Sequence, residues 1–157
     1  MATAFPVHIP FVEQLGFELI AMSGGAAELA VDLTEAHFNS WSVAHGGVLM
    51  TLLDVTMAHA ARSLGKPEDS YGPGVVTVEM KTSFMRPGEG RLRCEAKLLH
   101  RSVTLAFCEG SVFGDDGKLC AHATATFKYI KALPARDGAI KPLRPDGPQP
   151  DAATGAK

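Results

Sequence analysis

An aspartate in the middle of a long apolar segment is the residue best suited to chemistry. Asp54 lies in a helical pattern whose neighbours on every side are apolar or small, among them Leu53 and Met57. Aspartate is a poor helix former and is seldom buried without a partner. A carboxylate in an apolar setting suits a general base or a nucleophile. The alternative is a structural role, in which Asp54 bonds a nearby hydroxyl such as that of Thr51 or Thr56, or is partly exposed.

Two consecutive glycines stand near the start of the same segment. Gly46 and Gly47 follow His45, and the start of a helix leaves its first backbone N–H groups without intrahelical acceptors. Glycine lets a ligand approach those groups closely, and the helix dipole favours negative charge there. A carbonyl oxygen becomes negative as its carbon is attacked, so the pair is a candidate oxyanion hole. The alternative is that the glycines only allow a tight turn from loop to helix.

His45 and Asn39 are further candidates close to the glycines. Three roles are open for His45: a base, a hydrogen-bond donor to the substrate, or a residue that starts the helix. Asn39 is either a site residue or a loop amide that stabilises a turn. No metal is expected, because His45 and Asp54 are nine residues apart and no third ligand has a suitable spacing. A Ser-His-Asp mechanism is not expected either, because the sequence has no Gly-x-Ser-x-Gly motif.

The elements that must position these residues are one long helix with strands on both sides of it in sequence. Residues 43–64 are apolar on every side and lack proline, which predicts a helix enclosed by other structure. Alternating or β-branched runs between turn residues predict the strands. The further elements are one or two helical turns in residues 9–15 and strands at residues 17–22, 26–33, 75–84, 91–100, 104–113 and 119–130. This order predicts an α+β domain over residues 1–131, with one face or edge of its sheet packed against a second copy.

The C-terminal segment differs from the rest of the chain. Residues 132–157 hold five of the ten prolines and no aromatic residue. Such a segment cannot bury enough apolar surface to offset the entropy lost on ordering. We therefore expect a disordered, proline-rich tail.

Composition argues against several classes of function. Fifteen basic and 17 acidic residues give a net charge of −2 without a basic stripe, so nucleic acid is not an expected partner. Cys94, Cys108 and Cys120 fit no zinc or redox spacing, which favours buried hydrophobic roles in a reducing cytoplasm. The N-terminus shows no signal-peptide pattern. Residues 43–61 are nearly long enough to span a membrane, but they contain an aspartate and two histidines, so no membrane is expected as a partner.

The segment from Asn39 to Asp54, NSWSVAHGGVLMTLLD, resembles the signature of hotdog-fold thioesterases of the phenylacetate-pathway (PaaI-like) type. That signature has an asparagine, His-Gly-Gly beginning six positions later, and then an aspartate. Residues 75–87 and 106–127 are similar to the same family. The resemblance implies an antiparallel sheet wrapped around one long helix. It also implies a cytoplasmic acyl-CoA thioesterase that needs no cofactor.

The resemblance further implies a site shared by two subunits. Two sheets would join edge to edge in a homodimer, and dimers would pair into a homotetramer. The backbone N–H of Gly46 would polarise the thioester carbonyl, while Asn39 and His45 would orient the thioester or the attacking water. Asp54 would come from the other subunit and act as general base or nucleophile. Thr77 would hold the water near that carboxylate.

Coenzyme A would lie along two stretches of the chain, where Arg86 and Arg101 could meet its phosphates. The full set of expected acyl-CoA-binding residues is Gly47, Phe84, Met85, Arg86, Pro87, Gly88, His100, Arg101, Ser102, Val103 and Thr104. The acyl group is open, since small, medium-chain and aryl groups all suit an apolar pocket. Two alternatives stay open: a hotdog dehydratase, and a module that binds acyl-CoA without hydrolysing it.

Overall fold

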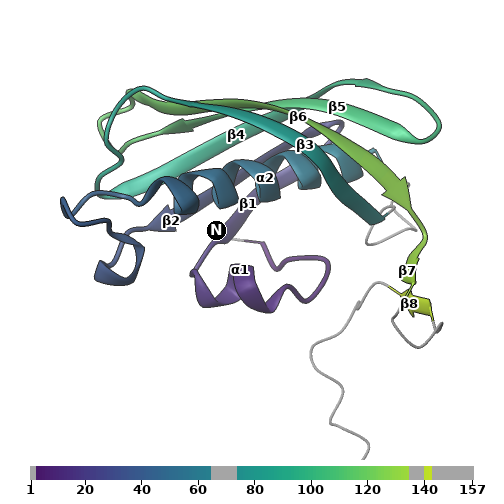
Figure 1. The fold of residues 1–157 in the computed structure, drawn as a ribbon, viewed down its shortest axis with the longest axis horizontal. Coiled ribbons are helices and arrows are strands. Elements are labelled where there is room, and N and C mark those ends of the chain that lie inside the picture. Colours follow the sequence, from purple (N-terminus) through teal and green to yellow (C-terminus); the bar gives the residue numbers. More distant parts are fainter. Residues whose placement is uncertain (1–2, 65–73, 135–139, 143–157) are drawn as a thin grey trace, which may run out of the picture.

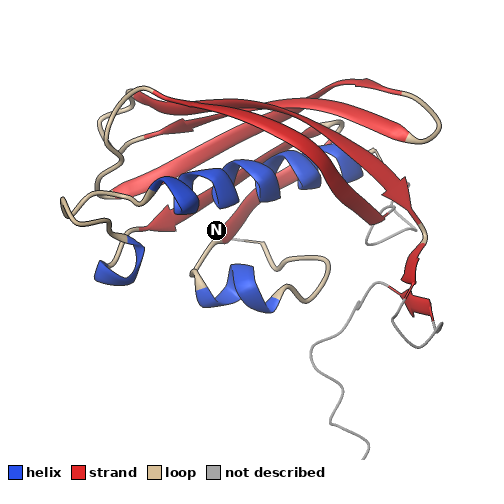
Figure 2. Cartoon of the chain, viewed as in Figure 1, coloured by secondary structure: helices blue, strands red, loops and turns tan. Residues whose placement is uncertain are grey.

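The computed structural model describes residues 3–64, 74–134 and 140–142. A curved antiparallel sheet wraps around one long helix, α2 (Gly46–Arg62), so the predicted α+β architecture is confirmed (Figures 1 and 2). The sheet strands are β1 (Glu18–Ser23), β2 (Ala26–Asp32), β3 (Gly74–Phe84), β4 (Arg91–Arg101), β5 (Leu105–Phe113) and β6 (Leu119–Ile130). Two short helices complete the domain, α1 (Pro10–Gln14) and the 3-10 helix η1 (Glu35–His37).

The strand order places β1 and β3 at opposite edges of the sheet. The order is β1-β2-β4-β5-β6-β3, and every neighbouring pair is antiparallel. β3 therefore follows α2 in sequence but pairs with β6, the last strand of the sheet. One side of β3 has no strand partner among the described residues. This leaves an 11-residue edge strand beside the helix.

The core lies between α2 and the concave face of the sheet. Alternation along β4 buries Leu92, Cys94 and Ala96 and exposes the charged residues between them, as its sequence predicts. All three cysteines are buried, as expected. Burial raises the pKa of Cys94 and of Cys108 to about 12, so both thiols stay protonated at neutral pH.

The helix is shorter at its start than its apolar pattern predicts. We expected it to begin at residue 43, but it begins at Gly46 because the His45 side chain caps it. Ala44, just before the cap, donates its backbone N–H to the Gly88 carbonyl at 2.9 Å. The segment between β2 and α2 contains η1. Buried His37 stabilises η1, because its Nδ1 accepts the Thr34 backbone N–H at 2.9 Å.

The proline-rich segment contains some regular structure. β7 (Ala132–Pro134) and β8 (Ile140–Pro142) pair as two short antiparallel strands, whereas we expected the whole segment to be disordered. The remainder of the expected tail, residues 135–139 and 143–157, lies outside the described residues. Within the described part of the chain, no helix combines the length and the apolar character needed to cross a membrane.

Candidate active site

Asp54 and Thr77 form a bonded pair between the helix and the edge strand. Thr77 Oγ1 donates a hydrogen bond to Asp54 Oδ1 at 2.7 Å. Asp54 is only half-buried, and its pKa is raised above the usual aspartate value because burial outweighs the opposing effect of the Thr77 bond. The structural alternative named Thr51 and Thr56 as partners, but these hydroxyls donate to the backbone carbonyls of residues 47 and 52. The carboxylate is thus bonded to the threonine that the resemblance implied.

The pairing of β3 with β6 is irregular next to Thr77. Thr77 pairs with Phe127 of β6, yet Glu79 pairs with the adjacent Thr126, so Val78 is an extra residue in the strand. Such bulges re-aim side chains and are frequent beside active sites. Phe127 is fully buried against α2, and Thr77 lies on the same face. The Thr126 side chain, on the outer face, bonds Glu79 instead.

His45 caps the helix with its ring. Its Nδ1 accepts the backbone N–H of Gly47 at 2.9 Å. Because Nδ1 is the acceptor, Nε2 carries the hydrogen in the neutral ring. The role of starting the helix is thereby confirmed. The exposed ring also keeps a hydrogen-bond donor available to a ligand.

The Gly46 backbone N–H has the position expected of an oxyanion donor. It is the first residue of α2, and no acceptor for its N–H is found among the described residues. A side chain added at Gly46 would meet the Phe84 ring at 3.6 Å, so Phe84 covers one side of this position. Gly47, by contrast, has its N–H bonded to His45 and is not a free donor. Of the two glycines, only Gly46 has a backbone N–H without an acceptor among the described residues.

Asn39 stabilises its own loop and borders the same region. Its Oδ1 accepts the backbone N–H groups of Trp41 and Val43 at 2.9 and 3.4 Å. This confirms the role of a turn-stabilising amide. Asn39 also lines a cavity of about 300 Å³ beside Gly46. The other lining residues are Val43, Ala44, Leu49, Phe84, Met85, Arg86, Pro87 and Gly88. One of the two stretches expected to bind coenzyme A is therefore brought to the start of α2.

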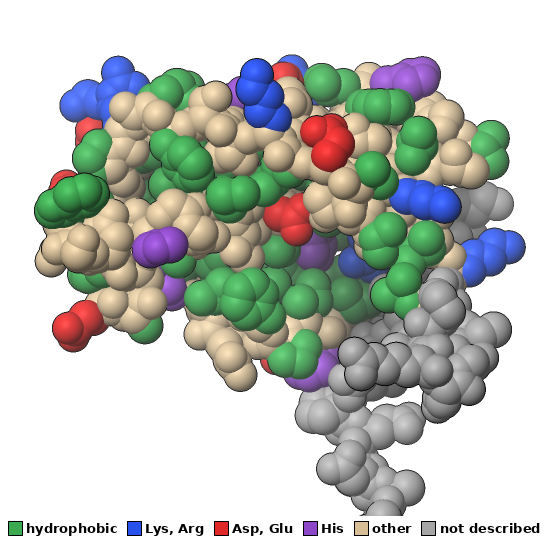
Figure 3. Space-filling model, viewed as in Figure 1, with side chains coloured by type: hydrophobic (Ala, Val, Ile, Leu, Met, Phe, Trp, Pro, Cys, Tyr) green, Lys and Arg blue, Asp and Glu red, His purple; other side chains and the backbone are tan. Residues whose placement is uncertain are grey.

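A second, larger cavity begins at Asp54 and Thr77 and runs toward the C-terminal end of α2. Its volume is about 560 Å³, and most of its lining area is apolar. Figure 3 shows hydrophobic side chains gathered around a hollow on this face of the molecule. The cavity also contains His59 and Arg62, which are buried. The sequence showed His59 as a histidine in an apolar helix, but no spacing rule assigned it a role.

The structure does not bring the second expected stretch into either cavity. His100, Arg101, Ser102, Val103 and Thr104 lie at the end of β4 and in the turn to β5, and none of them lines the two cavities just described. In Figure 1 this turn lies at the end of the sheet away from the start of α2. Within one chain, it is therefore remote from Gly46.

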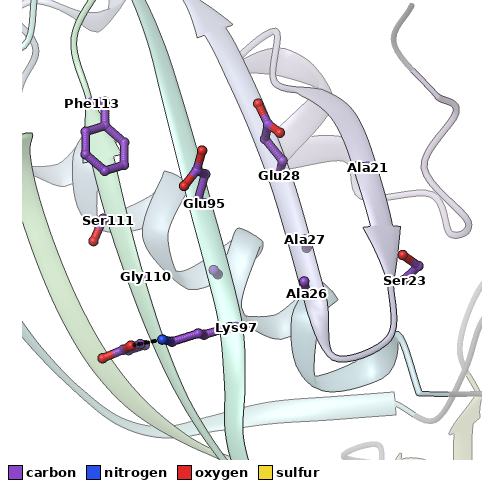
Figure 4. A pocket seen from close by; sticks show the side chains of 12 residues that line it. Ala21, Ser23, Ala26, Ala27, Glu28, Glu95, Lys97, Gly110, Ser111 and Phe113 are labelled. Atoms are coloured by element: carbon purple, nitrogen blue, oxygen red, sulfur yellow. Dashed lines mark ion pairs between the residues drawn. The ribbon is translucent and has the colours of Figure 1, made fainter. Parts of the chain in front are cut away.

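A further hollow of about 470 Å³ lies on the outer face of the sheet (Figure 4). Its side chains come from β1, β2, β4 and β5, and Lys97 and Glu109 form an ion pair of 2.9 Å there. Its lining includes no residue of the Asp54 or Gly46 regions. In the described part of the chain, no three His, Cys, Asp or Glu side chains are grouped so as to hold a metal ion.

The chain is similar to proteins of one family. The family model of the thioesterase superfamily matches residues 42–121. A conserved protein of Pseudomonas aeruginosa is 29 % identical with a TM-score of 0.72, over 80 % of this chain and 97 % of its own. A thioesterase family protein of Silicibacter pomeroyi is 28 % identical with a TM-score of 0.69, over 78 % and 90 %. A mutant of the phenylacetic acid degradation protein PaaI of Thermus thermophilus is 27 % identical with a TM-score of 0.67, over 78 % and 100 %.

Proposed function

Because the chain belongs to the thioesterase superfamily and, within it, to the PaaI-like hotdog proteins, it is a thioester hydrolase, and we propose that its substrate is an acyl-CoA in the cytoplasm. Water would cleave a small or medium acyl or aryl thioester to a free acid and coenzyme A. One observation carries the proposal: a half-buried carboxylate, Asp54, is held by Thr77 at an apolar cavity. The cavity suits an acyl group, and the carboxylate suits the activation of water.

Asp54 is proposed as the general base. It would take a proton from water, whose oxygen attacks the thioester carbon. The C–S bond of the resulting tetrahedral intermediate would then break, and the proton would pass to the sulfur of coenzyme A. Because burial raises the pKa of Asp54, its carboxylate is a stronger base than a solvated one. As nucleophile, Asp54 would instead attack the thioester carbon, and the C–S bond would break to release coenzyme A as its thiolate, which takes up a proton. Water would then cleave the resulting anhydride to the free acid and the Asp54 carboxylate.

The start of α2 is proposed to stabilise the negative oxygen. Gly46 offers a backbone N–H, and the helix dipole adds a favourable field. The Nε2–H of His45, which directly precedes Gly46, and the side-chain amide of Asn39, in the loop before α2, would orient the thioester or the water.

Spacing along the helix supports a site built from two chains. Asp54 is eight residues beyond Gly46, about 12 Å along the axis at 1.5 Å per residue. A base and an oxyanion donor must both act within about 3 Å of one reacting group. We therefore propose that Gly46 of one subunit works with Asp54 of another, in a homodimer or a homotetramer. The open edge of β3, with Val78 57 % exposed, is the proposed junction.

The same arrangement would join the two stretches proposed to bind coenzyme A. Phe84 to Gly88 border the cavity at the start of α2, and the turn after β4 lies at the other end of the sheet. Two chains could bring these stretches to one ligand. Arg86 is anchored through Nη1 to the Leu119 carbonyl at 3.0 Å, and Arg101 lies 4.9 Å from the Tyr129 ring centre. Both guanidinium groups are proposed to meet phosphates.

Thiol release from a panel of acyl-CoAs tests the proposal. Steady release of coenzyme A, followed with a thiol reagent, is the expected result. Tight binding without release would identify a module that only binds acyl-CoA. Water addition to an enoyl-CoA, followed by loss of its absorbance, would identify a hydratase or dehydratase.

A further inference from the structure

A buried histidine joins the loop before α2 to the end of α1. His37 is 5 % exposed, and it and Ala44 are the only buried residues in segment 34–45, all of which the structure describes. His37 Nε2 lies 3.0 Å from the carbonyl oxygen of Leu15, the C-cap of α1, and its Nδ1 lies 2.9 Å from the backbone nitrogen of Thr34. A carbonyl only accepts and an N–H only donates, so the neutral ring carries its hydrogen on Nε2.

The backbone of the same residue reaches the start of α2. The His37 carbonyl accepts the backbone N–H of His45 at 2.8 Å. His45 caps α2 with its ring, and Gly46 follows it directly. One residue therefore bonds α1 through its side chain and the helix cap through its backbone.

Few hydrogen bonds hold this loop against the rest of the domain. Asn39 fixes the internal shape of the loop, because its backbone and its side chain both bond other residues of the loop. Among the described residues, two hydrogen bonds join segment 34–45 to elements other than α2. One runs from the His37 ring to α1, and the other from the Ala44 backbone N–H to the Gly88 carbonyl. Loss of the first would let the loop shift together with the helix start that follows it.

We propose that His37 is a positioning residue for hydrolysis: its bond to the Leu15 carbonyl fixes the start of α2, and with it the direction of the Gly46 N–H. The inference rests on the proposed function, in which that N–H stabilises the negative oxygen. An oxyanion donor acts at about 2.7–3.1 Å from the developing charge. A displacement of about 1 Å can cost 10²-fold in rate, even when it starts far from the chemistry. The bond thus matters for the transition state, in which the oxygen is charged, more than for the bound substrate.

Asparagine and glutamine separate the roles of the two nitrogens of His37. Counted in bonds from Cβ, the terminal atoms of asparagine match Nδ1 and those of glutamine match Nε2. His37→Asn can therefore still accept the Thr34 N–H but cannot reach the Leu15 carbonyl, whereas His37→Gln can reach it. We expect kcat of His37→Asn to fall by about 10–10²-fold with KM for acyl-CoA unchanged, because only an interaction of the transition state is lost. His37→Gln should keep the natural kcat.

Ser63→Ala is the matched control at the other end of α2. Like His37, Ser63 accepts one backbone N–H, that of Gly25 at 2.7 Å, and donates to one backbone carbonyl, that of Ala60 at 2.9 Å. This variant should lower the melting temperature as His37→Asn does, but kcat should persist because the helix start is untouched. A purely structural His37 would behave like Ser63, with a lowered melting temperature and a natural kcat per folded molecule. That result would overturn the inference.

The single tryptophan of the chain reports on the loop without any catalysis. Trp41 lies four residues beyond His37, is 83 % exposed, and bonds the Asn39 side chain through its backbone N–H. Its steady-state fluorescence anisotropy should fall in His37→Asn, in which the loop is held less firmly, and should stay natural in His37→Gln and Ser63→Ala. Equal anisotropy in all four proteins would show that the loop is fixed without the His37 bond, and the inference would fail.

Failure to fold and failure of the proposed function are each distinguishable from failure of this inference. If His37→Asn does not fold, His37→Gln decides: a natural kcat supports the inference and a lowered kcat overturns it. If neither variant folds, His37 is required for folding and the inference fails. A natural kcat in folded His37→Asn rejects only the role of His37. Absence of thiol release from the natural protein rejects the proposed hydrolysis, and this inference with it.

Discussion

Thr77 of the edge strand bonds Asp54 of the central helix, with 2.7 Å between Thr77 Oγ1 and Asp54 Oδ1. The bond orients one carboxylate oxygen and opposes the rise in pKa that burial causes. Separate experiments can test the charge of this carboxylate, its bond to Thr77, and whether it acts with Gly46 of another subunit.

The charge of Asp54 is tested by Asp54→Asn. Asparagine keeps the shape and can still accept the Thr77 hydrogen bond, but it cannot take a proton. We expect turnover to fall by about 10²–10⁴-fold, the range usual for a positioned acid or base. The melting temperature at pH 7 should not fall, because a pKa raised in the folded state means that folding disfavours the ionised form. Asp32→Asn, at an exposed ion pair with Arg91, should leave turnover unchanged. A normal rate with a lowered melting temperature would make Asp54 a structural residue.

Thr77→Val tests the partner of the carboxylate through the pH dependence of the reaction. The Thr77 bond favours the ionised carboxylate, so its loss should raise the pKa of Asp54 further. Activity needs the ionised form, and the acidic limb of the kcat/KM profile should therefore move to higher pH. Thr126→Val is the matched control, since it removes a similar bond of 2.8 Å to Glu79 on the outer face. An acidic limb that stays in place would show that Thr77 does not control this carboxylate.

Subunit mixing tests whether one site uses two chains. Asp54→Asn and Gly46→Val are each expected to be nearly inactive. Valine at Gly46 would obstruct the approach to the helix start, and its Cβ makes only ordinary contact with Phe84. In a mixed dimer, one site keeps both natural residues and the other loses both, so activity should return in part. Absence of recovery, with subunit exchange shown by mass spectrometry, would place both groups in one chain.

The edge strand is tested by Val78→Lys. Val78 is exposed on β3, and two such strands paired around a twofold axis would bring the added charges close together. Light scattering should then show monomers, with turnover lost as the shared site comes apart. Phe11→Lys on α1 is the control at a similarly exposed position and should leave the assembly intact. Monomeric natural protein with full turnover would reject the shared site altogether.

His59 gives a prediction for stability against pH. Its pKa is about 4 in the folded chain and near 6.5 when solvated, so the unfolded state binds the proton more readily. Its contribution to stability is complete above pH 6.5 and is lost as the pH falls toward 4. Melting temperatures of His59→Phe and the natural protein should therefore diverge in that window, in favour of the variant. Parallel melting curves from pH 7 to pH 4 would contradict the burial of a neutral histidine.

Local sequence patterns determined the main elements and the central candidate. Alternation along β4 predicted which side chains face the core, because successive residues of a strand point to opposite faces. The apolar run around Asp54 predicted an enclosed helix, and the glycines marked its start. The predicted first residue of α2 was wrong by three positions, because apolar periodicity gives no signal for a capping side chain such as that of His45.

Tertiary structure alone decided which distant residues meet. Thr77 and Asp54 are 23 residues apart, and they meet because β3 crosses to the sheet edge beside β6 and carries a bulge. The resemblance implied this pair, but no periodicity could, because a repeat of polar and apolar residues specifies a face and not a neighbour. The absence of a hydrogen-bond partner for Nε2 of His59 among the described residues likewise follows only from its surroundings. A histidine in an apolar helix has the same sequence signal whether its second nitrogen is bonded or buried without a partner.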